Sequence, residues 1–214
     1  MADPNNILLN DHRLGVYAIP KVANTAMKIA LLSALGRPTD RPHAGFRGYA
    51  ADEIPMDFYS FGFIRSPVDR LVSAWREKCW SEEESPARRR FARWGLRRCN
   101  FQKFVDWVER CGPDRERTDQ HVRSQWMAVF RPGNIIGPTE LYAYERIGTA
   151  WPVIQARVAE RCNGLALPDL VTANASDSRD VAVPISLYQR VEQLYIHDLK
   201  LWKRANDQNP LLRG

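Results

Sequence analysis

Apolar and polar positions follow a strand–loop–helix order in the first part of the chain. The apolar run Val16 to Ile19 is short and ends at Pro20, which predicts a buried strand. The stretch Ala26 to Leu35 predicts a helix, and Gly36 directly after it is a usual helix stop. The residues between the two elements therefore form a tight loop at a helix N-terminus.

This loop carries a lysine at a place that favours anion binding. Backbone N–H groups and the helix dipole both attract negative charge to a helix N-terminus. Lys21 adds a full positive charge there, and Thr25 adds a hydroxyl. The common nucleotide loop G-x-x-x-x-G-K-[ST] is absent, because here the lysine comes first and the threonine follows four residues later. An ordinary strand–loop–helix with a surface lysine explains this segment equally well when it is taken alone.

A second strand–helix pair begins with the aromatic-rich run Phe58 to Ile64, which predicts a strand. Ser66 and Pro67 after it suit the N-cap and the first turn of a helix. One face of that helix is apolar and consists of Val68, Leu71, Val72 and Trp75. Arg65 lies at the strand end, and Ser73 lies two turns into the helix. If the two strands are parallel neighbours, both helix N-termini open at the sheet edge where ligands bind.

The length of 214 residues, with 44% apolar and 26% charged residues, predicts a single globular domain over residues 1–214. No segment approaches about eighteen consecutive apolar residues, so we expect no membrane span. The start M-A-D-P-N-N lacks the basic and apolar regions of a secretory signal. The four cysteines are widely spaced and form no C-x-x-C pair, so we expect no metal site. We interpret them as free thiols of a cytoplasmic protein.

The net charge of +6 indicates a polyanionic partner. No nucleic-acid-binding motif is visible, so nucleic acid is not the expected partner. A basic stretch from Arg88 to Arg98 is either a solvated face or the wall of a channel for an acidic acceptor. Arg89, Arg93 and Arg97 have the spacing of one helical face, and Phe91 and Trp94 are predicted to dock that helix.

Two stretches carry a family resemblance, namely I-P-K-V-A-N-T-A-M-K and F-I-R-S-P-V-D-R-L-V-S-A-W-R-E-K. They resemble carbohydrate sulfotransferases that use 3′-phosphoadenosine 5′-phosphosulfate (PAPS), most of all the Golgi enzymes that sulfate chondroitin, dermatan and glucuronyl glycans. Those enzymes carry I-P-K-V-G-[SC]-T and V-R-[DE]-P-[FV]-x-R-L-[VLI]-S-A-[YF]. Softer likenesses follow at Asn100 to Val108, Asp119 to Gln125 and Leu187 to Trp202. The membrane anchor of the Golgi enzymes has no counterpart in these stretches.

The resemblance implies an α/β fold, similar to P-loop kinases, in which helices flank a central parallel sheet. It implies that the 5′-phosphosulfate is bound by Lys21, Val22, Ala23, Asn24, Thr25 and Ala26. It assigns the 3′-phosphate to Arg65 and Ser73. Ala23 stands where the family usually has glycine. Because alanine avoids the left-handed conformation that a tight loop can require, we expect a different loop path there.

Sulfuryl transfer needs a cation at the leaving oxygen and a base for the acceptor hydroxyl, and positioning with electrostatics can supply both without a metal. Lys21 is the candidate cation. His43 and His121 are candidate bases, because histidine titrates near neutral pH; Glu53 is a carboxylate alternative. His43 lies 22 positions before Arg65, in the interval where wider sulfotransferase groups have a catalytic histidine. His121 lies in a stretch similar to the family's D-x-H motif.

The expected activity is therefore PAPS-dependent O-sulfation of a carbohydrate acceptor, with an acidic glycan among the candidates. One alternative is a small-molecule or lipid sulfotransferase with the same donor site. Another is a kinase-like nucleotide-binding protein. Further along the chain, we expect a helix over Ala150 to Cys162, a buried strand at L-Y-A-Y, a polar loop over Asp169 to Asp180 and one long helix over Pro184 to Arg204.

Overall fold

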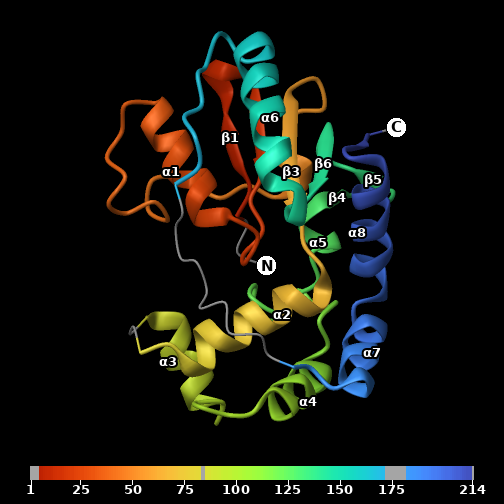
Figure 1. Cartoon of the computed structure of the whole chain (residues 1–214). Helices are drawn as coiled ribbons and strands as arrows, with labels where there is room; N and C mark the ends of the chain where they lie inside the picture. The colour runs from red at the N-terminus through yellow and green to blue at the C-terminus, as the bar shows by residue number, and fades with distance from the viewer. Residues whose placement is uncertain (1–4, 83–84, 172–181, 214) are drawn as a thin grey trace.

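The computed structural model describes residues 5–82, 85–171 and 182–213, and it is a mixed α/β structure (Figure 1). The strands are β1 (Ile7–Leu9), β2 (Leu14–Tyr17), β3 (Tyr59–Ile64), β4 (Phe130–Arg131), β5 (Ile135–Ile136), β6 (Glu140–Ala143) and β7 (Leu211–Leu212). The helices are α1 (Asn24–Ala34), α2 (Pro67–Trp75), α3 (Pro86–Arg93), α4 (Phe101–Cys111), α5 (Trp126–Val129), α6 (Ile147–Arg161), α7 (Ile185–Leu194) and α8 (Ile196–Gln208). A π-helical turn, Arg76–Trp80, continues directly from α2.

The central sheet has the strand order β1-β2-β3-β6-β7. Its three inner strands are parallel, with Val16 opposite Phe61 and Phe61 opposite Glu140. The predicted parallel pairing of the first two motif strands is therefore confirmed. The edge strands β1 and β7 run antiparallel to their neighbours, so the sheet is mixed rather than wholly parallel. The connection from β1 to β2 is only a short 3₁₀ turn, and a parallel pairing would need a crossover of a dozen or more residues.

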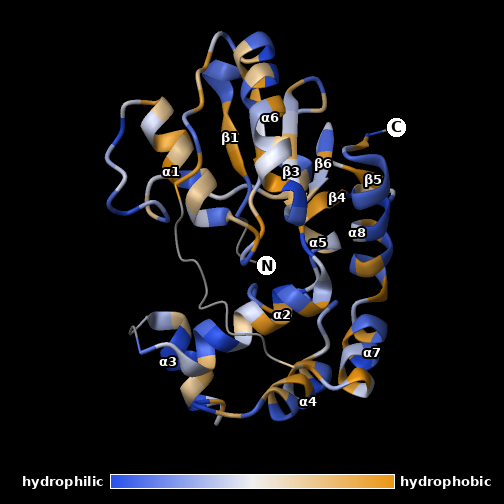
Figure 2. Ribbon diagram, in the orientation of Figure 1, coloured by the Kyte–Doolittle hydropathy of each residue, from blue (hydrophilic) through white to orange (hydrophobic). Residues whose placement is uncertain are grey.

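Buried apolar side chains form two clusters. The first surrounds the sheet; in it, α6 packs on β3 through the rings of Trp151 and Phe61, whose centroids lie 6.1 Å apart. The second cluster lies among α2, α3, α4 and α7 and includes Phe91 and Phe104. Figure 2 shows hydrophobic residues along β1 and mostly hydrophilic residues on α3. The chain therefore places a helical layer beside one end of the sheet.

The helices predicted after the two motif strands are present as α1 and α2, and L-Y-A-Y falls largely in strand β6, as predicted. The single long helix predicted over Pro184 to Arg204 is wrong, because the chain breaks at Tyr195 into α7 and α8. The apolar spacing continues across the break, but the two halves pack differently. Leu187 and Val191 of α7 join the helical cluster, whereas Leu201 of α8 joins the sheet cluster. The break at Tyr195 allows each half to face its own cluster.

The basic stretch is also shorter as a helix than its spacing predicts. Helix α3 ends at Arg93, and Gly95 after it has a positive φ of 74°. Arg97 therefore lies outside the helix, and the predicted three-arginine face is reduced to Arg89 and Arg93. Phe91 is fully buried as predicted, whereas Trp94 is 44% exposed and stacks on Trp107.

The four cysteines are free thiols, as predicted. Within the described residues no helix combines the length and apolar character needed to cross a membrane. Across residues 5–82, 85–171 and 182–213, no group of three or more His, Cys, Asp or Glu side chains is placed to hold a metal ion. Most of the polar loop predicted over Asp169 to Asp180 lies outside the described residues.

Candidate functional site

The segment between β2 and α1, residues 18–23, forms a compact loop that we call the Lys21 loop. Lys21 and Ala23 have positive φ values of 71° and 51°, and the N–H of Val22 donates to the carbonyl of Ile19 at 3.2 Å. Left-handed residues in a tight turn are typical of backbone nests that bind anions, so this loop is a candidate nest. Ala23 thus adopts the left-handed conformation that we expected alanine to avoid, at a cost of roughly 1–2 kcal/mol relative to the right-handed form.

Arg65 connects the second motif to the Lys21 loop. It follows β3, and its guanidinium donates to the carbonyl of Lys21 at 3.3 Å. The same guanidinium lies 4.8 Å from the ring centroid of Tyr144. Both backbone polar groups of Arg65 are bound by the side-chain amide of Gln125, at 3.1 and 2.9 Å. The two loops at the carboxyl ends of β2 and β3 are therefore in direct contact, as the parallel arrangement predicts.

Helix α2 presents a polar face opposite its apolar one. The polar face consists of Ser66, Arg70, Ser73 and then Glu77 in the following π-helical turn. Arg70 is only 3% exposed and donates to three carbonyls, those of Pro20 at 3.0 Å, Arg123 at 3.0 Å and Gln120 at 3.1 Å. One guanidinium thus ties the Lys21 loop to the segment that carries His121. Ser73 is buried on the same face of α2.

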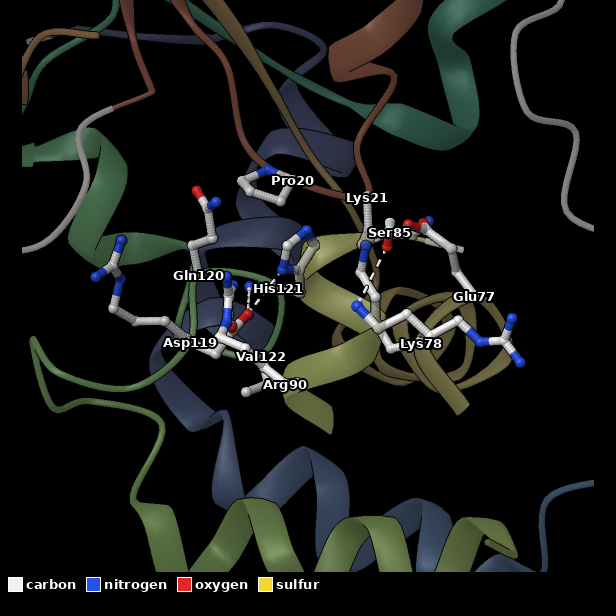
Figure 3. Close-up of polar contacts among 12 residues, drawn as sticks. Pro20, Lys21, Glu77, Lys78, Ser85, Arg90, Asp119, Gln120, His121 and Val122 are labelled. Carbon is white, nitrogen blue, oxygen red and sulfur yellow. Dashed lines mark hydrogen bonds and ion pairs between the residues drawn. The ribbon is translucent and has the colours of Figure 1, made fainter. Parts of the chain in front are cut away.

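A carboxylate joins two lysines beside the loop (Figure 3). Glu77 forms ion pairs with both Lys21 and Lys78. Burial alone would raise the pKa of Glu77, but the two ammonium groups lower that pKa to about 2. Burial lowers the pKa of Lys21 more than Glu77 raises it. The Lys21 side chain is 13% exposed, so its ammonium is held in a partly desolvated position beside the nest.

His43 contacts the first turn of α1. Its Nε2 is 3.2 Å from the hydroxyl oxygen of Thr25, and the residue is exposed. Burial of part of the ring, together with the positive charges of Lys28 and Lys78, lowers the pKa of His43 below its ordinary value. Lys28, one turn further along α1, is 5% exposed, and burial lowers the pKa of its ammonium group.

His121 is held by a carboxylate. Its Nδ1 lies 2.7 Å from Asp119, and Asp119 in turn forms a 2.8 Å ion pair with Arg90 of α3 (Figure 3). Burial lowers the pKa of His121 more than the bond to Asp119 raises it. The pKa of Asp119 is held well below its usual range, because His121 and Arg90 outweigh the effect of burial. The His121 ring, whose side chain is 15% exposed, is therefore partly buried and oriented by Asp119, and its pKa is lowered.

Comparison with known proteins identifies the family of this chain. The model of the sulfotransferase family matches residues 5–133, which is more than half of the chain. This chain belongs to the sulfotransferase family. The match spans the Lys21 loop, the β3–α2 segment and the segment with His121. No curated protein and no solved structure matches this sulfotransferase. Its general activity is sulfuryl transfer.

The structure of this sulfotransferase gathers most of the predicted residues. Lys21, Thr25, Arg65 and His43 meet at one edge of the sheet. Glu53 does not join them by any contact described here; its carboxylate accepts from the backbone N–H of Ala50 at 2.6 Å. His12 and His197, which carry no predicted role, also lie outside these contacts, and His197 packs on the ring of Trp126.

Sequence reasoning missed four residues of this site, namely Lys28, Arg70, Glu77 and Lys78. A signal for two of them was present in the sequence. Polar residues at 66, 70, 73 and 77 repeat at helical spacing opposite the apolar face of α2, which marks a second buried face. Lys28 and Lys78 show no such pattern, because burial of a single lysine depends on tertiary packing.

Proposed function

We propose that this sulfotransferase moves a sulfuryl group from PAPS to a hydroxyl of a carbohydrate. The observation that carries the proposal is the contact between two anion-binding loops, made by the guanidinium of Arg65 and the carbonyl of Lys21 at 3.3 Å. Each loop leads into a helix N-terminus, where anions are stabilised. PAPS carries two separate anionic groups, the phosphosulfate and the 3′-phosphate. Two adjacent cationic loops match that pair of charges.

The donor assignment follows from this pairing. The Lys21 loop and the first turn of α1 hold the 5′-phosphosulfate, through backbone N–H groups, Lys21 and Thr25; the residues concerned are Lys21, Val22, Ala23, Asn24, Thr25 and Ala26. Arg65 and Ser73 hold the 3′-phosphate. We infer a P-loop-kinase-like arrangement from the parallel strands β2, β3 and β6 and the loop–helix that follows β2. We also infer one functional domain over residues 1–214, because Arg70 bonds across from the helical layer to Pro20.

The transfer step uses one cation and one base. When the donor binds, the ammonium of Lys21 leaves its ion pair with Glu77 and contacts the donor oxygen that bridges sulfur and phosphorus. The acceptor hydroxyl oxygen bonds to sulfur as the bond from sulfur to that bridging oxygen breaks, and the electron pair leaves on adenosine 3′,5′-bisphosphate. The ammonium of Lys21 stabilises the charge that grows there. The acceptor proton passes to a neutral imidazole. The charge compensation comes from Lys21, so we expect no metal requirement.

We propose His43 as the base. An acceptor can reach His43, because it is exposed, and its Nε2 lies 3.2 Å from Thr25 in the loop that holds the donor. His121 is the second candidate, since Asp119 orients its ring. The variants His43→Ala and His121→Ala separate the two, because loss of the base removes the acid limb of the pH–rate profile, whereas loss of a supporting histidine preserves it.

The basic surface beside the site favours an acidic glycan as acceptor. Arg89 and Arg93 of α3, with Arg97 and Arg98 after it, are exposed. Trp94, 44% exposed among them, offers a flat apolar face for a sugar ring. A lipid acceptor would favour an apolar surface in this position. A kinase-like role is less well supported, because Lys21 is followed by Val22 and not by a magnesium-binding hydroxyl.

The test is transfer of label from [³⁵S]PAPS to a panel of chondroitin, dermatan, neutral oligosaccharides, simple phenols and lipids. We expect the parent protein to transfer label to the acidic glycans. The Lys21→Ala protein is the matched control and should transfer almost no label. Label found only on phenols or lipids would contradict the carbohydrate assignment while preserving the donor assignment. Absence of label on every acceptor, with no PAPS binding, would contradict both.

A further inference from the structure

Gln125 holds the backbone of Arg65 just past the point where the sheet ends. Strand β3 pairs with β2 as far as Gly62 and with β6 as far as Ile64, so the next residue lies beyond both ladders. The Gln125 side chain, which is 0% exposed, accepts from the N–H of Arg65 at 3.1 Å and donates to its carbonyl at 2.9 Å. One side-chain amide thus gives Arg65 the hydrogen bonds that a neighbouring strand gives to the residues before it.

A buried carboxylate holds Gln125 in turn. Asp198 of α8 is 0% exposed, and its two oxygens accept from the backbone N–H groups of Gln125 at 2.8 Å and Trp126 at 2.9 Å. Charge-assisted hydrogen bonds of this kind are stronger than neutral ones. The backbone of Gln125 is therefore fixed by α8, and its side chain is bonded to Arg65.

Helix α8 also supports the residue after Arg65. The N–H of Ser66 donates to Glu145 at 3.0 Å, and the other oxygen of Glu145 accepts from the indole of Trp202 at 2.8 Å. Trp202 follows Asp198 by four residues in α8, so the two lie on one face of the helix. The junction of β3 and α2 is therefore supported twice from a helix that lies outside the residues matched by the family model.

The direction of the Arg65 guanidinium depends on this backbone. The guanidinium itself has a long hydrogen bond to the carbonyl of Lys21, at 3.3 Å, and a contact with the ring of Tyr144, at 4.8 Å. A charged contact to a phosphate needs the planar guanidinium in one orientation. If the backbone of Arg65 were released, that orientation would have to be restored each time a ligand binds, at a cost in affinity.

We propose that Gln125 is a positioning residue, which directs Arg65 toward the 3′-phosphate of the donor, and that Asp198 keeps Gln125 in place. The proposal rests on the proposed function, because it takes Arg65 as the ligand of the 3′-phosphate. It assigns the preference for a 3′-phosphorylated nucleotide to Gln125 and α8 together. If Gln125 only satisfied two backbone groups, its loss would weaken the fold and would affect nucleotides with and without a 3′-phosphate alike.

The experiment compares two ligands that differ only in the 3′-phosphate. Adenosine 3′,5′-bisphosphate and AMP are titrated calorimetrically, below Tm, into the parent protein, Gln125→Met and Gln155→Met. Methionine keeps the length of glutamine and removes both hydrogen bonds. We expect Gln125→Met to weaken bisphosphate binding about tenfold and AMP binding less than about twofold. Gln155 of α6 donates to the carbonyl of Leu167 at 2.9 Å, a contact that involves neither loop, so Gln155→Met is the matched control and should leave the ratio of the two affinities unchanged.

A double-mutant cycle shows whether Gln125 acts through Arg65. In the Arg65→Ala background, Gln125→Met should change bisphosphate binding less than about twofold, because the guanidinium that Gln125 directs is gone. Asp198→Asn keeps one acceptor oxygen and should also lower the preference for the bisphosphate. It takes the place of Gln125→Met if that variant does not fold.

Three results would count against the proposal. An unchanged ratio of the two affinities in Gln125→Met, or the full effect persisting in Arg65→Ala, would overturn the positioning role. An unchanged ratio in Asp198→Asn would overturn the support from α8. A parent protein that binds the bisphosphate no more tightly than AMP would refute the proposed function itself, and the positioning role with it, because no 3′-phosphate site would then exist.

Discussion

Arg70 offers the sharpest test of how the site is held together. Its guanidinium donates to the carbonyls of Pro20, Gln120 and Arg123 from a position that is 3% exposed. In Arg70→Met the three carbonyls lose charged donors, and each unsatisfied buried acceptor costs about 1–3 kcal/mol. Removal of the guanidinium relieves its own desolvation cost, but it also leaves the buried carboxylate of Asp198 with less compensating positive charge. We expect a net destabilisation of about 3 kcal/mol.

For a chain of this length, about 3 kcal/mol lowers Tm by roughly 6–12 °C. The assay is thermal unfolding, followed by titration with adenosine 3′,5′-bisphosphate below Tm. Binding should also weaken, because Pro20 precedes Lys21 and the loop loses its anchor. Arg70→Lys should recover only part of the loss, since one ammonium cannot span three carbonyls. Arg93→Met, at an exposed arginine, is the matched control with little change. A fall in Tm below about 2 °C for Arg70→Met would refute the reasoning.

Four further predictions concern the site itself. Lys21→Ala should lower kcat by roughly a hundredfold or more, with a smaller effect on bisphosphate affinity, because its charge acts on the leaving oxygen; a near-parental kcat in steady-state assays would exclude it. Calorimetry should show Arg65→Ala weakening bisphosphate binding more than Ser73→Ala, since the arginine is charged; equal, normal binding by both would refute the 3′-phosphate assignment. The pKa of His43 is lowered, and the neutral ring is the active base, so kcat/KM should be retained above that pKa and fall as pH drops through it, with a midpoint below 6.5; a midpoint well above 6.5 would contradict His43. Ala23→Gly should raise the unfolding free energy by about 1 kcal/mol in thermal or urea unfolding, because glycine adopts φ of 51° without strain; a loss of stability would contradict the loop geometry.

The strand–loop–helix parts of the site could be predicted from the sequence, because their signals are local. Apolar runs, Pro67 after Ser66 and Gly36 after α1 fix these elements within a few residues. Adjacency of the two loops follows once β2 and β3 are parallel. Both loops carry their candidate anion-binding groups at strand ends, so these residues were also expected to lie close together.

The rest of the site depends on tertiary packing. Glu77 forms an ion pair with Lys21 from the π-helical turn after α2, and the spacing that places Glu77 on the polar face does not indicate which charge it meets. The break at Tyr195 is invisible in a continuous apolar spacing, because two separate clusters cause it. Lys28 has the sequence pattern of an ordinary helix residue, and its 5% exposure depends on packing against the rest of the fold.

We propose that the two loops together form a site for a 3′-phosphorylated adenosine donor. The most direct measurement is calorimetric titration of the parent protein with adenosine 3′,5′-bisphosphate, AMP and ATP at the same ionic strength, with chelator present. We predict that the bisphosphate binds at least tenfold more tightly than either of the others, because only it presents a 3′-phosphate to Arg65. Equal affinity for the three nucleotides, or preference for ATP, would contradict the account.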